Sequence, residues 1–305
     1  MPAFRSSRYR WSSPWRAEGG LASRMRVTAA ISPDPDDLFM FRALMEGLVD
    51  SRGLEFDVVT ADTDALNRMA AGDGADINAI SIAHYPRVAA HYQLFRHGAS
   101  VGRGYGPAVV CLRGQAPASL VGARIAVPGL TTTAWMVARM AIGEFEPVVT
   151  PIVPYARTFE ALRSGLVDAA LLIHEGRLTF ADEGCELLLD IGVAWQGWTG
   201  GLPLPLGGNV VRRALGPEVI GRVDAAVRDS IAHALHHREE AMDWLIARGV
   251  TLQDRARLDR YLGMYANADT LDMGEDGCEA VRRLLQLGAE RGWIPSVAVD
   301  FVGGP

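Results

Sequence analysis

LLIHEGRLTF, residues 171–180, is the stretch from which the fold of this chain is interpreted. The apolar run Ala169 to Ile173 predicts a buried parallel strand that stops at a histidine. In an open α/β sheet, the carboxyl ends of the strands border the ligand crevice. His174 is therefore a candidate acid–base group, and Gly176 would let the backbone turn sharply after it. A histidine that only caps a strand is the structural alternative, and the spacing alone does not separate the two.

Outward from this stretch, short apolar strands alternate with segments of helical periodicity. Strands or extended segments are expected at 26–31, 54–60, 77–81, 93–95, 108–112, 124–127, 146–154, 168–174 and 186–191. After residue 217 the chain is expected to be helical, over about 218–248, 252–265 and 275–292. This β–α alternation predicts an α/β fold with parallel sheets.

Two glycine-rich segments, 98–107 and 200–211, interrupt the alternation and are interpreted as crossovers between two lobes. Lobe one would comprise residues 26–107 plus 208–305, and lobe two residues 108–207. The ligand would lie between the lobes and face the strand ends at Ser32, Ser81, Thr132 and His174. Two such crossovers also predict a hinge motion.

Three consecutive threonines, residues 131–133, precede Ala134 at a predicted strand-to-helix turn. A threonine at a helix start is a natural cap, and the free N–H groups of the first turn attract anions. Capping accounts for one threonine, so three in a row favour contact with a ligand. His233 and His237 are helical neighbours without the glutamate of a zinc-protease motif, which favours a solvated or capping face.

Composition narrows the class of protein. The 305 residues carry a net charge of −6, which argues against nucleic acid as the main partner. No apolar run approaches the 20 or so residues of a membrane span, so no membrane partner is expected. Cys111, Cys185 and Cys278 are widely spaced and odd in number, which favours a reducing compartment and neither a disulfide nor a zinc framework.

The N-terminal segment is expected to lie outside the fold. Residues 1–25 are rich in Arg and Ser, and no apolar stretch follows that would make a secretory signal. Met25 directly precedes the first predicted strand, so the segment is interpreted as a disordered extension or a mis-assigned start. Without a signal, a cytoplasmic location is expected.

Six motifs in order identify a resemblance that covers about residues 27–295. They are SPDPDDLFMF (32–41), the DxxxLN pattern (62–67), GRGYGP (102–107), VPGLTTTA (127–134), IHEGRLTF (173–180) and TGGLPLPLGG (199–208). The chain resembles the 1,4-dihydroxy-6-naphthoate synthase family of the futalosine route to menaquinone. The resemblance implies a bilobal α/β fold of the periplasmic-binding-protein type II kind, with a ligand cleft between two domains.

The resemblance also implies an activity. Family enzymes are lyases that split cyclic de-hypoxanthine futalosine into 1,4-dihydroxy-6-naphthoate and a sugar-derived fragment, with no metal or organic cofactor. It makes His174 the proton-accepting base and a small molecule the partner. The expected substrate-binding residues are Ser32, Asn78, Ala79, Ile80, Ser81, Arg103, Thr132, Thr133 and Ala134.

The chain departs from the family pattern at two places. Asp34 and Asp36 stand where the family usually has Cys and Asn, and Asn78 to Ser81 replaces a Thr-Lys-Leu-Ser segment. The mouth of the cleft should be more negative, which weakens the binding of a carboxylate-bearing substrate. His84, Tyr85 and Arg103 are candidates for compensating contacts. Alternatively, the two aspartates only cap a helix that begins near Asp37.

Three other functions stay open at this point. One is a paralogue with the same chemistry on another small molecule, and another is the sister activity of chorismate dehydration, which the IHEGR and TGGLPLPLGG motifs fit less well. The third is a solute-binding protein of a transporter, for which a histidine base would not be required. Assembly into a homodimer is also left open.

Overall fold

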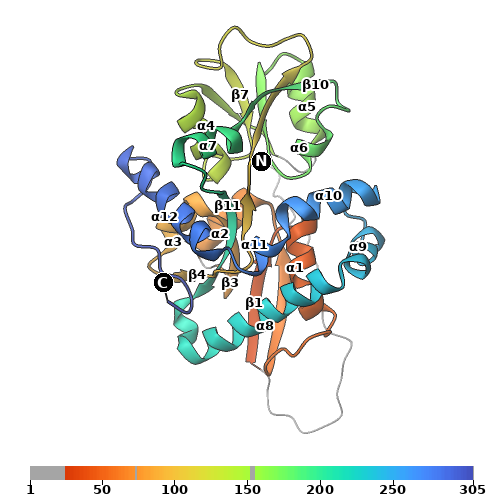
Figure 1. Cartoon of the computed structure of the whole chain (residues 1–305), viewed down its shortest axis with the longest axis vertical. Coiled ribbons are helices and arrows are strands. Elements are labelled where there is room, and N and C mark those ends of the chain that lie inside the picture. The colour runs from red at the N-terminus through yellow and green to blue at the C-terminus, as the bar shows by residue number, and fades with distance from the viewer. Residues whose placement is uncertain (1–24, 73, 152–154, 305) are drawn as a thin grey trace, which may run out of the picture.

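Two β-sheets lie one after the other along the long axis of the molecule, and each forms the centre of one lobe (Figure 1). The computed structural model describes residues 25–72, 74–151 and 155–304. The predicted N-terminal extension therefore lies outside the described residues except for Met25. The end of the predicted extended segment 146–154 also lies outside them. The bilobal α/β prediction is confirmed.

The first lobe is built on a six-stranded sheet of order β2-β1-β3-β11-β4, with β5 paired to β11. Its strands are β1 (Met25–Ile31), β2 (Leu54–Thr60), β3 (Ile77–Ser81), β4 (Tyr92–Leu94), β5 (Ser100–Gly102) and β11 (Leu204–Arg212). Strand β1 lies between β2 and β3 and pairs with β2 in register Met25↔Leu54, while its side chains Val27, Ala29 and Ile31 are buried in the core.

The second lobe is built on a five-stranded sheet of order β10-β6-β9-β7-β8. Its strands are β6 (Ala108–Leu112), β7 (Arg124–Val127), β8 (Glu146–Val149), β9 (Ala169–Leu172) and β10 (Cys185–Asp190). All four residues of β9 are buried, as its apolar run predicts. This strand ends one residue before Ile173, so His174 lies in the turn beyond it.

The expectation of parallel sheets is wrong in part, because both sheets are mixed. β1 pairs in parallel with β2 and β3, and β7 pairs in parallel with β8 and β9. However, β11 runs antiparallel to β3, and β6 runs antiparallel to β9. β6 follows the first predicted crossover, whereas β11 takes up most of the second, so the interpretation of 200–211 as a connector is wrong from Leu204 onward. Each of these two strands enters its sheet from the other lobe, so it runs opposite to strands that arrive through a β–α–β connection.

Helices follow most strands and then form the C-terminal third of the chain. They are α1 (Pro35–Met45), α2 (Thr63–Ala71), α3 (Tyr85–Val88), α4 (Thr133–Ile142), α5 (Ala156–Arg163), α6 (Gly176–Thr179), α7 (Ile191–Thr199), α8 (Gly216–His236), α9 (Arg238–Ala247), α10 (Arg255–Tyr265), α11 (Ala268–Leu271) and α12 (Gly274–Glu290), with 3₁₀ turns η1 (Ile82–His84) and η2 (Arg213–Leu215). The predicted single helix 218–248 is wrong, because the backbone leaves the helical region at His237 (φ −108°, ψ 42°) and separates α8 from α9.

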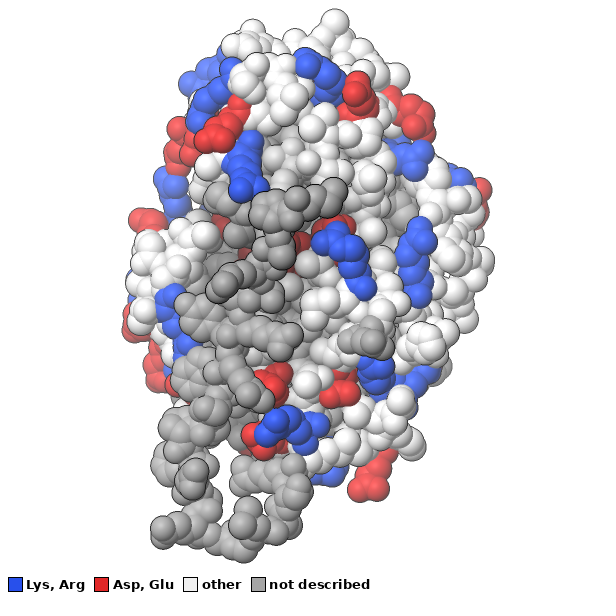
Figure 2. Space-filling view, turned by 180° about the vertical axis from the view of Figure 1, so that it is seen from behind, with Lys and Arg blue, Asp and Glu red and all other residues white. Residues whose placement is uncertain are grey.

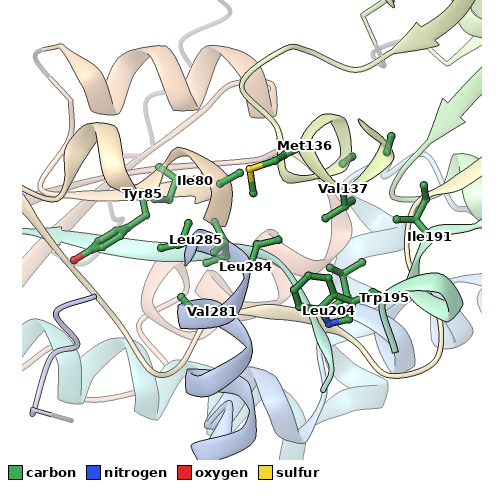
Figure 3. Packing of buried hydrophobic residues seen from close by; sticks show 14 of the residues in the cluster. Ile80, Tyr85, Met136, Val137, Ile191, Trp195, Leu204, Val281, Leu284 and Leu285 are labelled. Carbon is green, nitrogen blue, oxygen red and sulfur yellow. The ribbon is translucent and has the colours of Figure 1, made fainter. Parts of the chain in front are cut away.

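One apolar cluster continues from the first lobe into the second (Figure 3). Leu284 of α12 packs in the same cluster as Ile80 of β3, Val137 of α4 and Trp195 of α7. The indole N–H of Trp195 donates to the carbonyl of Pro203, just before β11 begins at Leu204. Pairing with the first sheet thus starts upstream of the predicted lobe boundary at 207/208.

The surface mixes both signs of charge. On the face shown in Figure 2, arginine and acidic side chains of the described residues lie interspersed. Among the described residues, none of the helices combines the length and apolar character that a bilayer span requires.

Candidate active site

A cavity lies between the lobes, at the ends of strands from both sheets. Its polar lining comes from Ser32, Asp36, Asp37, Thr63, Ser81, Ser100, Asn209 and Tyr265 on the first lobe, and from Thr132, Thr133 and His174 on the second. Apolar walls are added by side chains such as Leu66, Ile80, Ala134 and Leu206. None of the described residues that line the cavity is an arginine, so apart from His174 an anionic ligand would depend on neutral donors there.

His174 occupies the turn after β9 with a left-handed backbone (φ 47°). This region is uncommon for residues other than glycine and is typical of sites where a side chain must be aimed. The sharp turn is thus made by His174 itself, and the predicted turning role of Gly176 is wrong. Gly176 is required for a different reason: a Cβ there would lie 2.6 Å from the ring of Tyr155.

The imidazole of His174 contacts groups of the first lobe. Its Nδ1 lies 3.2 Å from the hydroxyl of Tyr261 on α10 and 3.5 Å from Oδ2 of Asp34. The Tyr261 hydroxyl donates to Oδ1 of Asp36 at 2.9 Å, and the Ser100 hydroxyl donates to Oδ2 of Asp36 at 3.1 Å. The histidine therefore comes from one lobe and its hydrogen-bonding partners come from the other.

The acidic turn before α1 does more than cap the helix. Asp34 occupies the N-cap position, but its side chain makes no cap hydrogen bond and instead accepts from the hydroxyl of Ser32. Asp37 accepts from the Ser32 backbone N–H at 2.6 Å. The interpretation of Asp34 and Asp36 as mere caps is wrong. The helix also begins at Pro35, two residues before the predicted start, and this puts Asp36 and Asp37 in its first turn.

Burial and charge shift the titration of the site. Burial raises the pKa of Asp36 and of Asp37, and neighbouring carboxylates add to both increases. Burial alone would lower the pKa of His174, but Asp34, Asp36 and Glu175 together raise that pKa above its usual value. Burial and Asp34 likewise raise the pKa of Glu175. The negative charge of the carboxylates thus favours the imidazolium form of His174. Burial opposes this effect, because it raises the pKa of the carboxyl groups themselves.

The hydroxyls of the three threonines are already engaged. Thr131 donates to Asp64 at 2.7 Å, Thr132 caps α4 by accepting from the Trp135 N–H at 3.1 Å, and Thr133 donates to the Leu206 carbonyl at 2.7 Å. Thr132, Thr133 and Ala134 do line the cavity. A ligand would therefore meet their backbone N–H groups and apolar atoms more readily than their hydroxyls.

The structure brings most of the predicted site residues together. Ser32, Ala79, Ile80, Ser81, Thr132, Thr133, Ala134 and His174 line the cavity. Asn78 does not: it is fully buried, and its amide donates to the carbonyls of Leu66 and Ala79. Arg103 does not either, since its guanidinium is paired with Asp269 and Asp276 at 2.7 Å each.

His84 and Tyr85, the other candidates for compensating contacts, also lie outside the cavity lining. Both are buried in the first lobe, and burial lowers the pKa of His84 to about 4. A neutral His84 adds no positive charge to the cleft, so the excess of carboxylates there is not balanced by this route.

Sequence reasoning missed Tyr261 and Tyr265. Both lie on the predicted helix 252–265, four residues apart, so they share one face of α10. Their rings pack 4.8 Å apart, and Tyr265 lines the cavity. Two tyrosines on one helix face were a usable signal, but helical spacing alone does not reveal which lobe that face meets.

In the described part of the chain, one group of side chains could share a metal ion. Ligand atoms of Asp34, Asp36 and His174 lie within 4.8 Å of one another. Each of these side chains already has a hydrogen-bonding or ionic contact within the protein. The cluster is therefore accounted for by its own contacts.

Solved structures support the fold. A crystal structure of a protein from Archaeoglobus fulgidus superposes with a TM-score of 0.82 at 39% identity and covers 90% of this chain and all of that one. The alkanesulfonate-binding protein SsuA from Xanthomonas axonopodis pv. citri matches with a TM-score of 0.63 over 92% of this chain and 98% of its own, at 13% identity. The second likeness shows the fold alone.

Sequence comparisons identify the family. A 1,4-dihydroxy-6-naphthoate synthase from Thermus thermophilus is 41% identical over 86% of this chain and 93% of its own length. An enzyme of the same name from Streptomyces coelicolor is 37% identical over 90% and 97%. The profile of the family described as "Menaquinone biosynthesis" matches residues 27–290. With its periplasmic-binding-protein-like lobes and its cleft between them, the chain belongs to this menaquinone biosynthesis family.

Proposed function

We propose that the chain is a lyase that cleaves cyclic de-hypoxanthine futalosine to 1,4-dihydroxy-6-naphthoate, with His174 as the general base. The observation that carries the proposal is the position of His174, whose imidazole lines the cavity between the lobes on a left-handed turn. The names of the two sequence relatives give the product, 1,4-dihydroxy-6-naphthoate, and the substrate is taken from the resemblance in the sequence motifs. No metal or organic cofactor is included in the proposed reaction.

The surroundings of His174 suit proton transfer. Its side chain is 20% exposed, so it can meet a substrate in the cavity while its Nδ1 faces the protein. Carboxylates nearby stabilise the positive charge that the imidazole gains when it accepts a proton. The start of α4, with Thr133 and Ala134 in its first turn, offers backbone N–H groups to an anionic part of the substrate.

The test is turnover of cyclic de-hypoxanthine futalosine by the purified full-length chain, followed by chromatography and mass spectrometry. We expect 1,4-dihydroxy-6-naphthoate to form. In His174→Ala, kcat should fall by roughly 10²- to 10⁴-fold, the usual contribution of a general base. Wild-type activity in that variant would remove His174 from the mechanism.

His236→Ala is the matched control. His236 is exposed on α8, outside the cavity lining, and its ring hydrogen-bonds the carbonyl of Ala232 in its own helix. Its replacement should leave turnover unchanged. The control thus distinguishes a specific effect of removing His174 from a general effect of removing a histidine. Circular dichroism of both variants establishes that they are folded.

A paralogue acting on a different substrate is the second candidate. Asp36 and Asp37 line a cavity to which the described residues bring no arginine, and this disfavours a carboxylate-bearing substrate. Failure of folded wild-type protein to make 1,4-dihydroxy-6-naphthoate would favour this candidate. A thermal-shift screen of neutral and cationic small molecules would then identify the ligand. Ligand binding without any turnover would indicate a solute-binding protein instead.

A further inference from the structure

The hydrogen bonds of Tyr261 determine which nitrogen of His174 is free. The Tyr261 hydroxyl has one proton and two neighbours, Oδ1 of Asp36 at 2.9 Å and Nδ1 of His174 at 3.2 Å. A carboxylate can only accept, so an ionised Asp36 takes the tyrosine proton. The tyrosine oxygen must then accept from His174, which requires the proton of the imidazole to be on Nδ1.

Two further contacts favour the same tautomer. Asp34 Oδ2 lies 3.5 Å from Nδ1 and is itself held by the hydroxyl of Ser32, so a second acceptor faces this nitrogen. Asp36 uses both of its oxygens as acceptors, since Ser100 donates to Oδ2 at 3.1 Å. A protonated Asp36 would free the Tyr261 hydroxyl to donate to Nδ1 and would give the opposite tautomer.

We propose that Asp36, acting through Tyr261, is a positioning residue that holds neutral His174 as the Nδ1–H tautomer and leaves Nε2 as the proton acceptor. This inference rests on the proposed role of His174 as base. Nε2 takes the substrate proton, and Nδ1–H goes on donating to Tyr261. The logic is that of a histidine oriented by a buried carboxylate, here with a tyrosine hydroxyl between them.

The hydrogen-bonded series Asp36–Tyr261–His174, called the relay below, spans the cleft between the lobes. Asp36 is in the first turn of α1 and Tyr261 is on α10, both in the first lobe, whereas His174 follows β9 in the second. Lobe closure therefore brings the imidazole to a tyrosine that Asp36 has already oriented. It also explains the two carboxylates that depart from the family pattern: they serve the histidine, and Asp34 does not line the cavity at all.

The surroundings of His174 also predict at which pH activity is lost on the acid side of the pH profile. The titratable groups that face His174 are Asp34, Asp36 and Asp37 at the start of α1, Glu175 beside it, and Tyr261 and Tyr265 on α10. The carboxylates together raise the pKa of His174. Since the base must be neutral, kcat/KM should rise with pH through a value above that of an ordinary histidine.

Two variants separate the tautomer from the charge. Tyr261→Phe removes the hydroxyl and should let neutral His174 populate the Nε2–H tautomer. Asp36→Asn keeps an acceptor for Tyr261, while its amide can donate to the Ser100 oxygen, whose proton has the Tyr265 carbonyl as a second acceptor at 3.3 Å. This variant should keep the Nδ1–H tautomer but move the pKa of His174, and the acid limb, to lower pH.

The direct readout is ¹⁵N NMR of full-length protein labelled at histidine, with the His174 signals assigned through His174→Ala. Above the pKa of the imidazole, we expect the shifts of the Nδ1–H tautomer in wild type and Asp36→Asn, and a change in Tyr261→Phe. In turnover, Tyr261→Phe should lower kcat by about 10- to 100-fold with little change in KM. Tyr92→Phe is the control, because Tyr92 is an equally buried tyrosine that donates to Ala75 outside the site.

The Nε2–H tautomer in wild type would overturn the relay, and so would a Tyr261→Phe variant with wild-type ring shifts and pH profile. An equal change in Tyr92→Phe would also overturn it, because the effect would then be one of packing. The NMR experiment needs no substrate. If the ring shifts are as predicted but no 1,4-dihydroxy-6-naphthoate forms, the proposed function is therefore rejected and the relay is retained.

Discussion

At the scale of single residues, the site concentrates buried carboxylates around one imidazole. Asp34, Asp36, Asp37 and Glu175 all have less than a tenth of their surface exposed. Each carboxylate that ionises there loses hydration and meets the others as like charges. The arrangement favours the imidazolium of His174 but disfavours the folded state at neutral pH. A site of this kind is expected to exchange stability for function.

Asp37 allows this cost to be measured. Burial and neighbouring carboxylates raise the pKa of Asp37 well above its usual value. A carboxyl whose folded pKa is raised contributes stability below its unfolded pKa of 3.8, and that contribution is lost as pH rises through the folded pKa. Asp37→Asn removes the charge and still accepts from the Ser32 N–H. We expect a higher Tm at pH 7.5, by roughly 2–4 °C for each kcal/mol regained.

The control for that prediction is the pH dependence itself. The gain in Tm should shrink as pH falls toward 4, where wild-type Asp37 is also protonated. Differential scanning calorimetry of both proteins across this range measures it. A gain that is the same at every pH would mean that the charge of Asp37 is not its source.

At the scale of elements, the first crossover is anchored to α6 and α7 by one ion pair. Arg177 of α6 pairs with Asp190 at 2.5 Å and donates to the Gly106 carbonyl at 2.7 Å. Asp190 also caps α7 by accepting from the Gly192 N–H at 2.9 Å. A Cβ at Gly106 would lie 2.6 Å from the backbone N of Gly192, so this joint depends on direct backbone contact. The Arg of the IHEGR motif is thus structural.

Arg177→Met keeps the aliphatic part of the side chain but leaves Asp190 without its cation. Both side chains are less than a sixth exposed, so the loss should lower the free energy of unfolding by about 3–5 kcal/mol. Urea denaturation followed by fluorescence measures it. Arg163→Met is the matched control, because its pairing with Glu183 is half exposed and should be worth no more than about 1 kcal/mol. Equal losses in the two variants would contradict the anchoring role.

At the scale of the whole molecule, hydrogen bonds close the cleft on the side of α2 and α4. The Thr131 hydroxyl, from the second lobe, donates to Asp64 at 2.7 Å and accepts from the Asn67 amide at 3.0 Å. The Ala83 N–H donates to the Thr133 hydroxyl at 3.1 Å. Because the relay of His174 also spans the lobes, closure and assembly of the base are expected to be one event.

Thr131→Val keeps the shape of the side chain and removes two of these bonds. At about 0.5–1.5 kcal/mol each, their loss should shift the lobes toward the open state and raise KM by roughly 5- to 150-fold. Small-angle X-ray scattering without substrate should give a larger radius of gyration. Thr150→Val is the control, since its hydroxyl bonds the Val148 carbonyl within one lobe. An unchanged KM and radius in Thr131→Val would contradict closure through this contact.

Local sequence determined much of this protein. Apolar runs and glycine-rich interruptions predicted most of the strands and the bilobal class, because strand and turn preferences act between neighbouring residues. They missed β5 and β11, which occupy parts of the two segments interpreted as crossovers. The six motifs identified the family and the histidine at the end of β9. The same local reasoning mistook mixed sheets for parallel ones and joined α8 to α9, because strand direction and helix breaks are decided by what packs around them.

Only the tertiary structure decided what surrounds His174. Asp36 and Tyr261 are 225 positions apart, and no periodicity relates a residue of α1 to one of α10. For the same reason Arg103 was predicted from its motif to bind substrate in the cleft, whereas its guanidinium forms ion pairs with Asp269 and Asp276. Local preferences depend on neighbouring residues and can be read from the sequence. The partners of a buried side chain depend on which distant segments pack together to exclude water, and this is decided only in the folded structure.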